Sequence, residues 1–319
     1  MKLAVGPRTV AVGHSRARPE GCAEQGRVGV VVSALSRLIA AYKGPAGADV
    51  LMFAKSWSQA SGRPLKVVTI YPGPAPIGMG RVDAEWVAYN HEEANEILDE
   101  ARGLLNAFDA EFVAVPSDSA SHGLHDVQEA AGHDSIVILG SRKTRGVRRT
   151  APGNTAERLL HGAPGPVGLV PWDYEAGSIG PIKRVAVAYI DTEDGRAALT
   201  AAAGMASELH AELQLVTVMP DTRVTPAMGE PSIYRDEERD SFAAALEEAS
   251  RILPGGLTPT TRLLGGPVVD ALGDLRPEDA DVLVCGSRGY GPARRVLLGG
   301  VSSRLLGHAR LPVIIVPRN

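Results

Sequence analysis

A glycine-rich segment at residues 286–300 (GSRGYGPARRVLLGG) has the residue types that can hold a phosphate group. It follows an apolar run and precedes an amphipathic stretch, so we expect it to join a strand to a helix. Glycine lets the backbone approach an anion closely and admits positive φ. The free amides at the start of the following helix also favour a phosphate. A strand-to-helix turn that needs glycine only for packing explains the spacing equally well.

Basic side chains occur within this segment and in a second one. Arg288, Arg294 and Arg295 could meet a terminal phosphate, although arginines that flank a surface loop are common. Residues 142–149 (RKTRGVRR) hold five basic side chains in eight, without interleaved aromatics. The net charge is −4, the isoelectric point is near 6.1 and aromatics make up 4% of the chain. We therefore expect solvated or phosphate-facing loops, and neither nucleic acid nor an anionic membrane as a partner.

Other arrangements that carry chemistry are absent from the sequence. It has no Ser-His-Asp arrangement, no paired catalytic carboxylates, no Gly-x-Ser-x-Gly elbow and no lysine-bearing P-loop. His122, His125 and His133 have a spacing that metal ligands use, but no cysteine accompanies them. A loop that enters a helix explains these histidines more simply. The sequence therefore predicts no catalytic residue and no metal ligand.

The cysteines and the apolar runs of the sequence indicate the cellular compartment in which the protein is expected. Cys22 and Cys285 have no paired spacing, and Cys285 lies in an apolar run, which predicts a buried reduced thiol. No uninterrupted run of 18 apolar residues occurs, and the apolar stretch at 28–42 is interrupted by Arg37. We expect neither a transmembrane helix nor a signal peptide, and a cytoplasmic protein by default.

An internal repeat decides the domain count. Three segments return in the same order: RLIAAY at 37–42 as RVAVAY at 184–189, IVILGSR at 136–142 as VLVCGSR at 282–288, and PVGLVP at 166–171 as PVIIVP at 312–317. The offset is 147 residues for the first segment and 146 for the other two. Because three matches at nearly one offset are hard to obtain by chance, the chain is a duplication.

Within each copy, short apolar runs alternate with amphipathic segments in a β-α-β-α-β-α-β-α-β pattern. Strands are expected at 38–42, 65–70, 112–115, 136–139 and 167–170, and again at 185–190, 213–218, 261–264, 282–285 and 313–316. Helices are expected at 48–60, 86–107, 124–131 and 155–160, and again at 196–209, 234–253, 268–272 and 302–308. Strands that are apolar throughout favour parallel sheets buried on both faces, so each copy is expected to be a five-stranded, doubly wound α/β domain.

The predicted domain boundaries follow from the repeat. Domain 1 covers residues 37–173 and domain 2 covers residues 182–319, with a polar linker at 173–181. Residues 1–36 match nothing in the second copy, and we expect them to form a disordered tail. Alternatively, the start codon has been assigned too far upstream and these residues are not part of the native protein. Two Pro/Gly-rich stretches, 72–80 and 220–231, are expected to be mobile loops beside a ligand site.

The segment at 286–300 resembles the nucleotide loop of the universal stress protein family, Gly-x2-Gly-x9-Gly-(Ser/Thr), which it matches at Gly286, Gly289 and Gly299. Residues 301–317 are also similar to the closing helix and strand of that family. The resemblance implies two Rossmann-like, adenine nucleotide α-hydrolase-like domains that form a pseudo-dimer. It also implies that Gly289 and Gly299 line a triphosphate and that Val218 touches the adenine.

Domain 2 departs from the family pattern at two positions. Gly300 stands where the family has Ser or Thr after the last glycine; Ser302 could replace that hydroxyl or could cap the helix. Ile190 stands where the first strand of the family usually ends in an aspartate, and Asp191 follows one residue later. A shift of one residue at a strand end could turn Asp191 toward or away from the adenine.

Domain 1 departs further. Lys43 stands at the aspartate position and Lys143 at the second glycine, although Gly153 and Asn154 keep the end of the motif. A lysine side chain obstructs a backbone that must approach phosphate, although its charge could instead pair with an anion. We therefore expect domain 1 to bind nucleotide weakly or not at all and to serve as a partner for domain 2.

The resemblance implies a non-catalytic, cytoplasmic universal stress protein that binds ATP, or AMP or ADP, with Mg²⁺ able to accompany ATP, and that regulates a stress response. The expected contacts are Asp191, Val218, Gly286, Ser287, Arg288, Gly289, Gly299, Gly300, Val301 and Ser302. The two domains are expected to pair through strands 167–170 and 313–316, whose edges would otherwise be exposed. The formation of a homodimer and the binding of unidentified protein partners are further possibilities.

Two alternatives stay open beside nucleotide binding. A scaffold that has lost nucleotide and acts through protein contacts is favoured by Lys43, Lys143, Ile190 and Gly300. A nucleotidyl-transferring or ATP-hydrolysing enzyme on the same fold needs a metal-holding acid and an activated nucleophile, and the sequence shows neither. Slow hydrolysis of ATP is compatible with the sequence.

Overall fold

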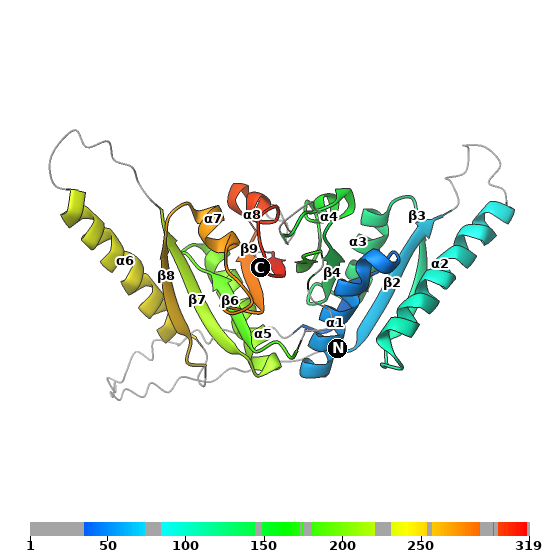
Figure 1. The fold of residues 1–319 in the computed structure, drawn as a ribbon, viewed down its shortest axis with the longest axis horizontal. Helices are drawn as coiled ribbons and strands as arrows, with labels where there is room; N and C mark the ends of the chain where they lie inside the picture. The colour runs from blue at the N-terminus through cyan, green and yellow to red at the C-terminus, as the bar shows by residue number, and fades with distance from the viewer. Residues whose placement is uncertain are drawn as a thin grey trace, which may run out of the picture.

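The computed structural model of the chain describes residues 35–73, 84–143, 149–172, 174, 180–220, 231–253, 257–287, 296 and 299–317, and for residues 231–235 the backbone alone. Within these ranges the elements alternate between strand and helix along both copies (Figure 1). The duplicated α/β architecture that the sequence predicts is confirmed. The predicted tail at 1–36 and the loops at 72–80 and 220–231 fall almost wholly outside the described residues, as do Cys22, Arg288 and Gly289.

The first half contains five strands and the helices between them. Its elements are β1 (Leu38–Ala41), η1 (Pro45–Gly47), α1 (Ala48–Ser61), β2 (Leu65–Pro72), α2 (Ala84–Leu105), β3 (Glu111–Ser117), α3 (Ala120–Ala131), β4 (Ile136–Gly140), α4 (Asn154–Leu159) and β5 (Val167–Val170). The helix α3 begins four residues earlier than the sequence predicts, since the side chain of Ser119 accepts a hydrogen bond from the backbone N–H of His122 at 3.2 Å and caps the helix.

The second half repeats this order. Its elements are β6 (Arg184–Ala188), α5 (Glu193–Leu209), β7 (Glu212–Met219), α6 (Pro231–Arg251), β8 (Thr260–Gly265), α7 (Val268–Gly273), β9 (Val282–Gly286), α8 (Gly300–Leu305) and β10 (Val313–Val316). Two ends differ from the prediction. The strand β6 stops at Ala188 rather than Ile190, and α5 starts at Glu193 because Thr192 caps it by accepting from the backbone N–H of Gly195 at 3.1 Å.

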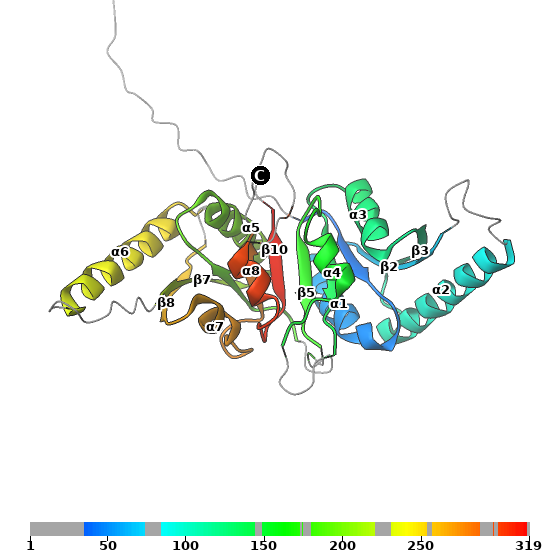
Figure 2. The same cartoon turned by 90° about the horizontal axis from the view of Figure 1, so that it is seen from above.

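The strands of the described residues form one ten-stranded sheet in the order β3-β2-β1-β4-β5-β10-β9-β6-β7-β8. The pairings are parallel within each half, and β5 and β10 pair antiparallel in the middle, where Figure 2 shows them side by side. The predicted pairing of these two strands is confirmed. In each half the strand order changes direction at the first strand, between β1 and β4 and between β6 and β9, which is where ligands bind in open α/β sheets.

Two reciprocal hydrogen bonds join the halves beyond the central strands. The backbone N–H of Thr150 donates to the carbonyl of Ala309 at 2.6 Å, and that of Val296 donates to the carbonyl of Ala163 at 3.0 Å. The donors are 146 residues apart, as are the acceptors, which is the repeat offset. The contact is therefore self-complementary, as a two-fold interface between identical subunits would be.

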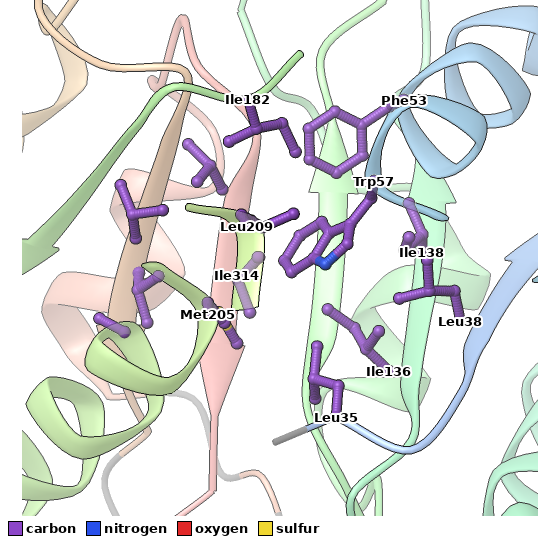
Figure 3. Close-up of a cluster of buried hydrophobic side chains, with 14 of the residues drawn as sticks. Leu35, Leu38, Phe53, Trp57, Ile136, Ile138, Ile182, Met205, Leu209 and Ile314 are labelled. Carbon is purple, nitrogen blue, oxygen red and sulfur yellow. The ribbon is translucent and has the colours of Figure 1, made fainter. Parts of the chain in front are cut away.

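The core is continuous across the two halves. The indole of Trp57 on α1 points toward Leu209 and Ile314 of the second half (Figure 3) and is 0% exposed. The ring of Phe53 packs edge-on against Trp57 with 5.7 Å between ring centroids. Because one apolar cluster draws on both copies, neither half buries its core alone.

Candidate functional site

A cleft of about 350 Å³ opens at the carboxyl ends of β6 and β7, beside the point where the strand order of the second half changes direction. Much of its lining is apolar, formed by Ala188, Val216, Val218, Val268, Leu272, Cys285 and Leu305. The lining also includes Gly286, Gly299, Val301 and Ser302, and the rest of it comes from Tyr189, Ile190, Thr192, Asp194, Gly195, Pro220 and Phe242. A partly apolar concavity at this place in a doubly wound sheet is the usual form of a small-molecule site.

Half of the predicted contact residues lie on this cleft. Val218, Gly286, Gly299, Val301 and Ser302 line it, although three different segments of the chain supply them. Of the other predicted contacts, Asp191, Ser287 and Gly300 do not form its walls, and Arg288 and Gly289 lie outside the described residues.

The hydroxyl of Ser302 has a structural partner. It donates to the carbonyl of Gly286 at 3.1 Å, and the side chain of Ser302 is nearly buried. It therefore does not cap α8, whose N-cap is Gly299 without a side-chain hydrogen bond. The bond connects the start of α8 to the end of β9, and so it holds the segments that carry Gly299 and Gly286 close together.

The loop between β6 and α5 closes tightly against the end of β9. A Cβ atom placed on Gly286 would lie 2.5 Å from the carbonyl oxygen of Asp194, and one placed on Gly195 would overlap the carbonyl oxygen of Ile190. Glycine at both positions lets the loop turn into the cleft. Sequence reasoning missed Gly195 and Asp194; a capping threonine followed by Asp-Gly at 194–195 was the signal available.

Asp191 lies outside the cleft walls. Its side chain is exposed, and its Oδ1 atom accepts from the Nε and Nη2 atoms of Arg196 at 2.9 and 2.7 Å. The hydroxyl of Tyr189 lies 3.4 Å from the same oxygen, and burial together with the Asp191 carboxylate raises the pKa of Tyr189. The ion pair with Arg196 thus holds the Oδ1 atom of Asp191 outside the cleft lining.

Ile190 and Asp194 are two of the residues through which this loop lines the cleft. Ile190 lines the cleft and is 54% exposed, so an apolar side chain stands at the position where the sequence resemblance implies a carboxylate. Asp194 lines the cleft from the first turn of α5, and its Oδ1 atom is buried without a hydrogen-bond partner. Of the aspartates in this loop, Asp194 and not Asp191 therefore lines the cleft.

Two buried groups flank the glycine side. The backbone N–H of Ser287 donates to the carbonyl of Val316 at 2.9 Å, and its hydroxyl is buried without a partner. Cys285 is a buried free cysteine, as the sequence predicts, and burial raises the pKa of its thiol to about 12. The thiol is therefore protonated near neutral pH and serves as an apolar part of the cleft lining.

In the first half, side chains occupy the positions that correspond to the glycine edge. The methylene groups of Arg142 pack over Gly153, where an added Cβ would lie 3.3 Å from Cγ of Arg142. The Nε atom of Arg142 donates to the carbonyl of Pro152 at 3.0 Å. The Nζ atom of Lys143 lies 5.0 Å from the centroid of the Trp172 ring, a cation–π distance. Arg142 therefore covers this edge, while Lys143 is turned toward Trp172.

The histidines considered as metal ligands lie on and beside α3. His122 contacts Asp118 at 2.9 Å and Asp126 at 3.6 Å, and the hydrogen bond to Asp118 raises the pKa of His122. The side-chain ligand atoms of His125, Asp126 and Glu129 lie within 4.8 Å of one another at the surface. The Nδ1 atom of His133 instead donates to the carbonyl of Pro164 at 2.9 Å. A set of exposed groups on one helix does not distinguish a metal site from a solvated face.

These features define a tandem, doubly wound α/β protein with a cleft at the strand-order reversal of its second half. The sequence model of the "Universal stress protein family" matches residues 36–171 and 181–317. Because these two matches cover most of the chain, the protein belongs to the universal stress protein family, with two tandem copies of its domain.

Individual relatives agree with this assignment. A universal stress protein of Mycobacterium tuberculosis is 27% identical over 271 residues, covering 79% of this chain and 89% of that protein. One from Mycolicibacterium smegmatis is 26% identical over 253 residues, covering 78% and 83%. The crystal structure of a universal stress protein from Archaeoglobus fulgidus has the same fold, with a TM-score of 0.64, 19% identity and coverage of 89% of this chain and 99% of that one. Among the described residues, no helix has the length and apolar character needed to cross a bilayer.

Proposed function

We propose that this protein binds an adenine nucleotide, ATP or else AMP or ADP, in the cleft of its second half, and that the bound nucleotide regulates its contacts during stress without being a substrate. The observation that carries the proposal is the cleft itself. It has a volume of about 350 Å³, lies at the strand-order reversal and joins an apolar wall to an edge formed by Gly286 and Gly299.

The two sides of the cleft suit the two ends of a nucleotide. Val216 and Val218 on β7, together with Leu272 on α7, offer an apolar surface on which a planar base can lie. Gly286 and Gly299 present backbone without side chains at the other side, where phosphates can approach closely. Asp191, Ser287, Arg288, Gly289 and Gly300 stay predicted contacts.

The regulatory part of the proposal rests on linkage. A ligand that binds only the folded protein stabilises it in proportion to the logarithm of its concentration relative to the dissociation constant. Between β9 and α8, the backbone N–H of Val296 donates to the carbonyl of Ala163 in the first half. A nucleotide held by this loop would therefore act on a segment that also touches the other domain, and would alter the surface that partners meet.

A nucleotide-free scaffold that acts through protein contacts is the second candidate. The exposed Ile190 at the usual aspartate position favours it, and so does Arg142, which covers the glycine edge of the first half. In that case the duplicated sheet and its shared core would serve to bind protein partners, and the cleft would no longer bind nucleotide.

Isothermal titration calorimetry separates the two candidates. Full-length protein, freed of copurifying nucleotide, is titrated with ATP and with AMP in the presence of Mg²⁺, and thermal unfolding is followed in parallel. Nucleotide binding predicts saturable heat, one site per chain and a rise in the unfolding temperature. No heat and no thermal shift at millimolar nucleotide would leave only the scaffold.

Substituting Gly300 with serine is expected to tighten ATP binding by about 3- to 10-fold, the equivalent of one additional hydrogen bond. The substitution restores the hydroxyl that the family loop carries after its last glycine. Gly300 is exposed, and a Cβ placed on it meets nothing within 4 Å, so the fold can accept the side chain. Calorimetry on the variant, with Gly300→Ala as the matched control, measures the gain. Equal affinities of the two variants would show that the hydroxyl makes no contact.

A further inference from the structure

Asp194 is the one charged side chain among the described residues that line the second-half cleft. It belongs to the first turn of α5, and its Oδ1 atom is buried without a hydrogen-bond partner. Buried polar groups in folded proteins are nearly always paired, because an unpaired one forfeits its hydration without compensation. The Oδ1 atom of Asp194 is therefore an unused hydrogen-bond acceptor on a residue that lines the cleft, and a ligand can supply its donor.

The position of Asp194 fixes which end of the ligand it meets. Its main chain lies against Gly286 at the end of β9, where a Cβ on that glycine would come within 2.5 Å of the Asp194 carbonyl and 3.3 Å of its Cβ. The surface proposed for the base includes Val216 and Val218 of β7, and β7 and β9 lie on opposite sides of β6. Asp194 is thus beside Gly286, on the side of β6 away from the β7 residues proposed for the base.

A carboxylate at this place has a defined chemical preference. When ionised it only accepts hydrogen bonds, so its partner must be a hydroxyl, an amino group or a cation. A phosphate oxygen carries the same sign of charge, and the repulsion between two anions grows as water is excluded from the site. The described lining supplies no positive side chain to offset that repulsion.

We propose that Asp194 is a specificity-determining residue of the cleft, which accepts a hydrogen bond from a donor of the nucleoside and disfavours a triphosphate that no divalent cation accompanies. The inference rests on the proposed function and deepens it. It predicts that adenosine and Mg²⁺-bound ATP are good ligands, whereas ATP in the presence of a chelator is a poor one.

The test uses calorimetric titration of the full chain with adenosine, with ATP and Mg²⁺, and with ATP and EDTA. The wild-type protein is expected to bind ATP about tenfold more weakly in EDTA than in Mg²⁺, a difference within the reach of one partly buried charge. Asp194→Asn keeps an acceptor oxygen and removes the charge. It should therefore strengthen ATP binding in EDTA by about tenfold and change adenosine binding by less than about threefold.

Glu193→Gln is the matched control, because it removes a charge from the same helical turn at an exposed position outside the cleft lining. It should leave all three affinities within about twofold, since exposed charges are screened by solvent. If Asp194→Asn leaves the ratio of ATP to adenosine affinity unchanged, or if Glu193→Gln shifts it equally, the assignment to Asp194 is wrong.

Thermal unfolding without ligand gives a readout that does not need nucleotide binding. If the Oδ1 atom of Asp194 accepts a hydrogen bond only from a bound ligand, the ligand-free Asp194→Asn protein loses no hydrogen bond at this atom. Its unfolding temperature should therefore equal or exceed that of the wild-type protein. A clear fall would mean that the carboxylate stabilises the start of α5 and would overturn the inference. If the wild-type protein binds none of the three ligands, the proposed function fails, and the unfolding result alone then decides what Asp194 does.

Discussion

Replacing Trp57 with alanine is expected to lower the free energy of unfolding by about 3–5 kcal/mol, the usual cost of deleting a large aromatic side chain from a core. Trp57 is 0% exposed and belongs to the apolar cluster that includes Leu209 and Ile314 of the second half (Figure 3). The change leaves a cavity at the junction of the two copies, so it should destabilise both of them. Chemical denaturation followed by circular dichroism measures the loss.

The matched control is Trp86→Ala on α2, whose side chain is 46% exposed. Surface substitutions of this kind usually change stability by less than about 0.5 kcal/mol. The shared sheet and core also predict that the chain unfolds in one transition, which Trp57→Ala shifts as a whole. Two transitions, of which the variant moves only the one belonging to the first half, would show that the copies are independent domains with a weak contact.

The elements of this fold could be predicted from sequence because each of them satisfies a local rule. Strands such as Val282–Gly286 are apolar on both faces, which only a doubly covered parallel sheet explains. The duplication then identified the central contact, since two copies of one edge strand, β5 and β10, can bury each other. Both conclusions follow from composition and period alone.

The loop after β6 could not be predicted in the same way. Its path depends on contacts between distant segments: Gly195 packs on Ile190, and Gly286 packs on Asp194. These contacts end the strand early and leave Asp191 beside Arg196 while Asp194 enters the cleft wall. The sequence suggested that a shift of one residue determines whether Asp191 faces the cleft. In the structure, the packing of the backbone determines which side chain of the loop lines the cleft.

The degenerate loop of the first half shows the same limit. The sequence identified Lys143 as the obstruction because it replaces a glycine of the motif. In the structure, Lys143 lies near Trp172, and Arg142, which the two copies share as Arg142 and Arg288, covers Gly153. A packing contact of this kind leaves no signal in the sequence, so only the three-dimensional arrangement reveals it.

The first half also supports the cleft of the second. The guanidinium of Arg149 donates to the carbonyl of His308 at 2.8 Å and to Asp274 at 3.1 Å, at the turns that follow α8 and α7. Both of these helices carry residues of the cleft wall. The first half, whose own glycine edge is covered by Arg142, thus contacts the ends of both helices and helps to fix the shape of the cleft in the second half.

Val301→Trp is expected to weaken ATP binding by at least about 100-fold while leaving the fold intact, because an indole in the cleft occupies the space that the ligand needs. Val301 lines the cleft of about 350 Å³ and is only partly buried, so the larger side chain can enter the cleft without displacing the core. Ser303→Trp places the same group two residues later at an exposed position and should bind ATP as the wild-type protein does. Calorimetry and circular dichroism on both variants measure affinity and folding. Unchanged ATP binding by a folded Val301→Trp protein would place the nucleotide elsewhere on the molecule.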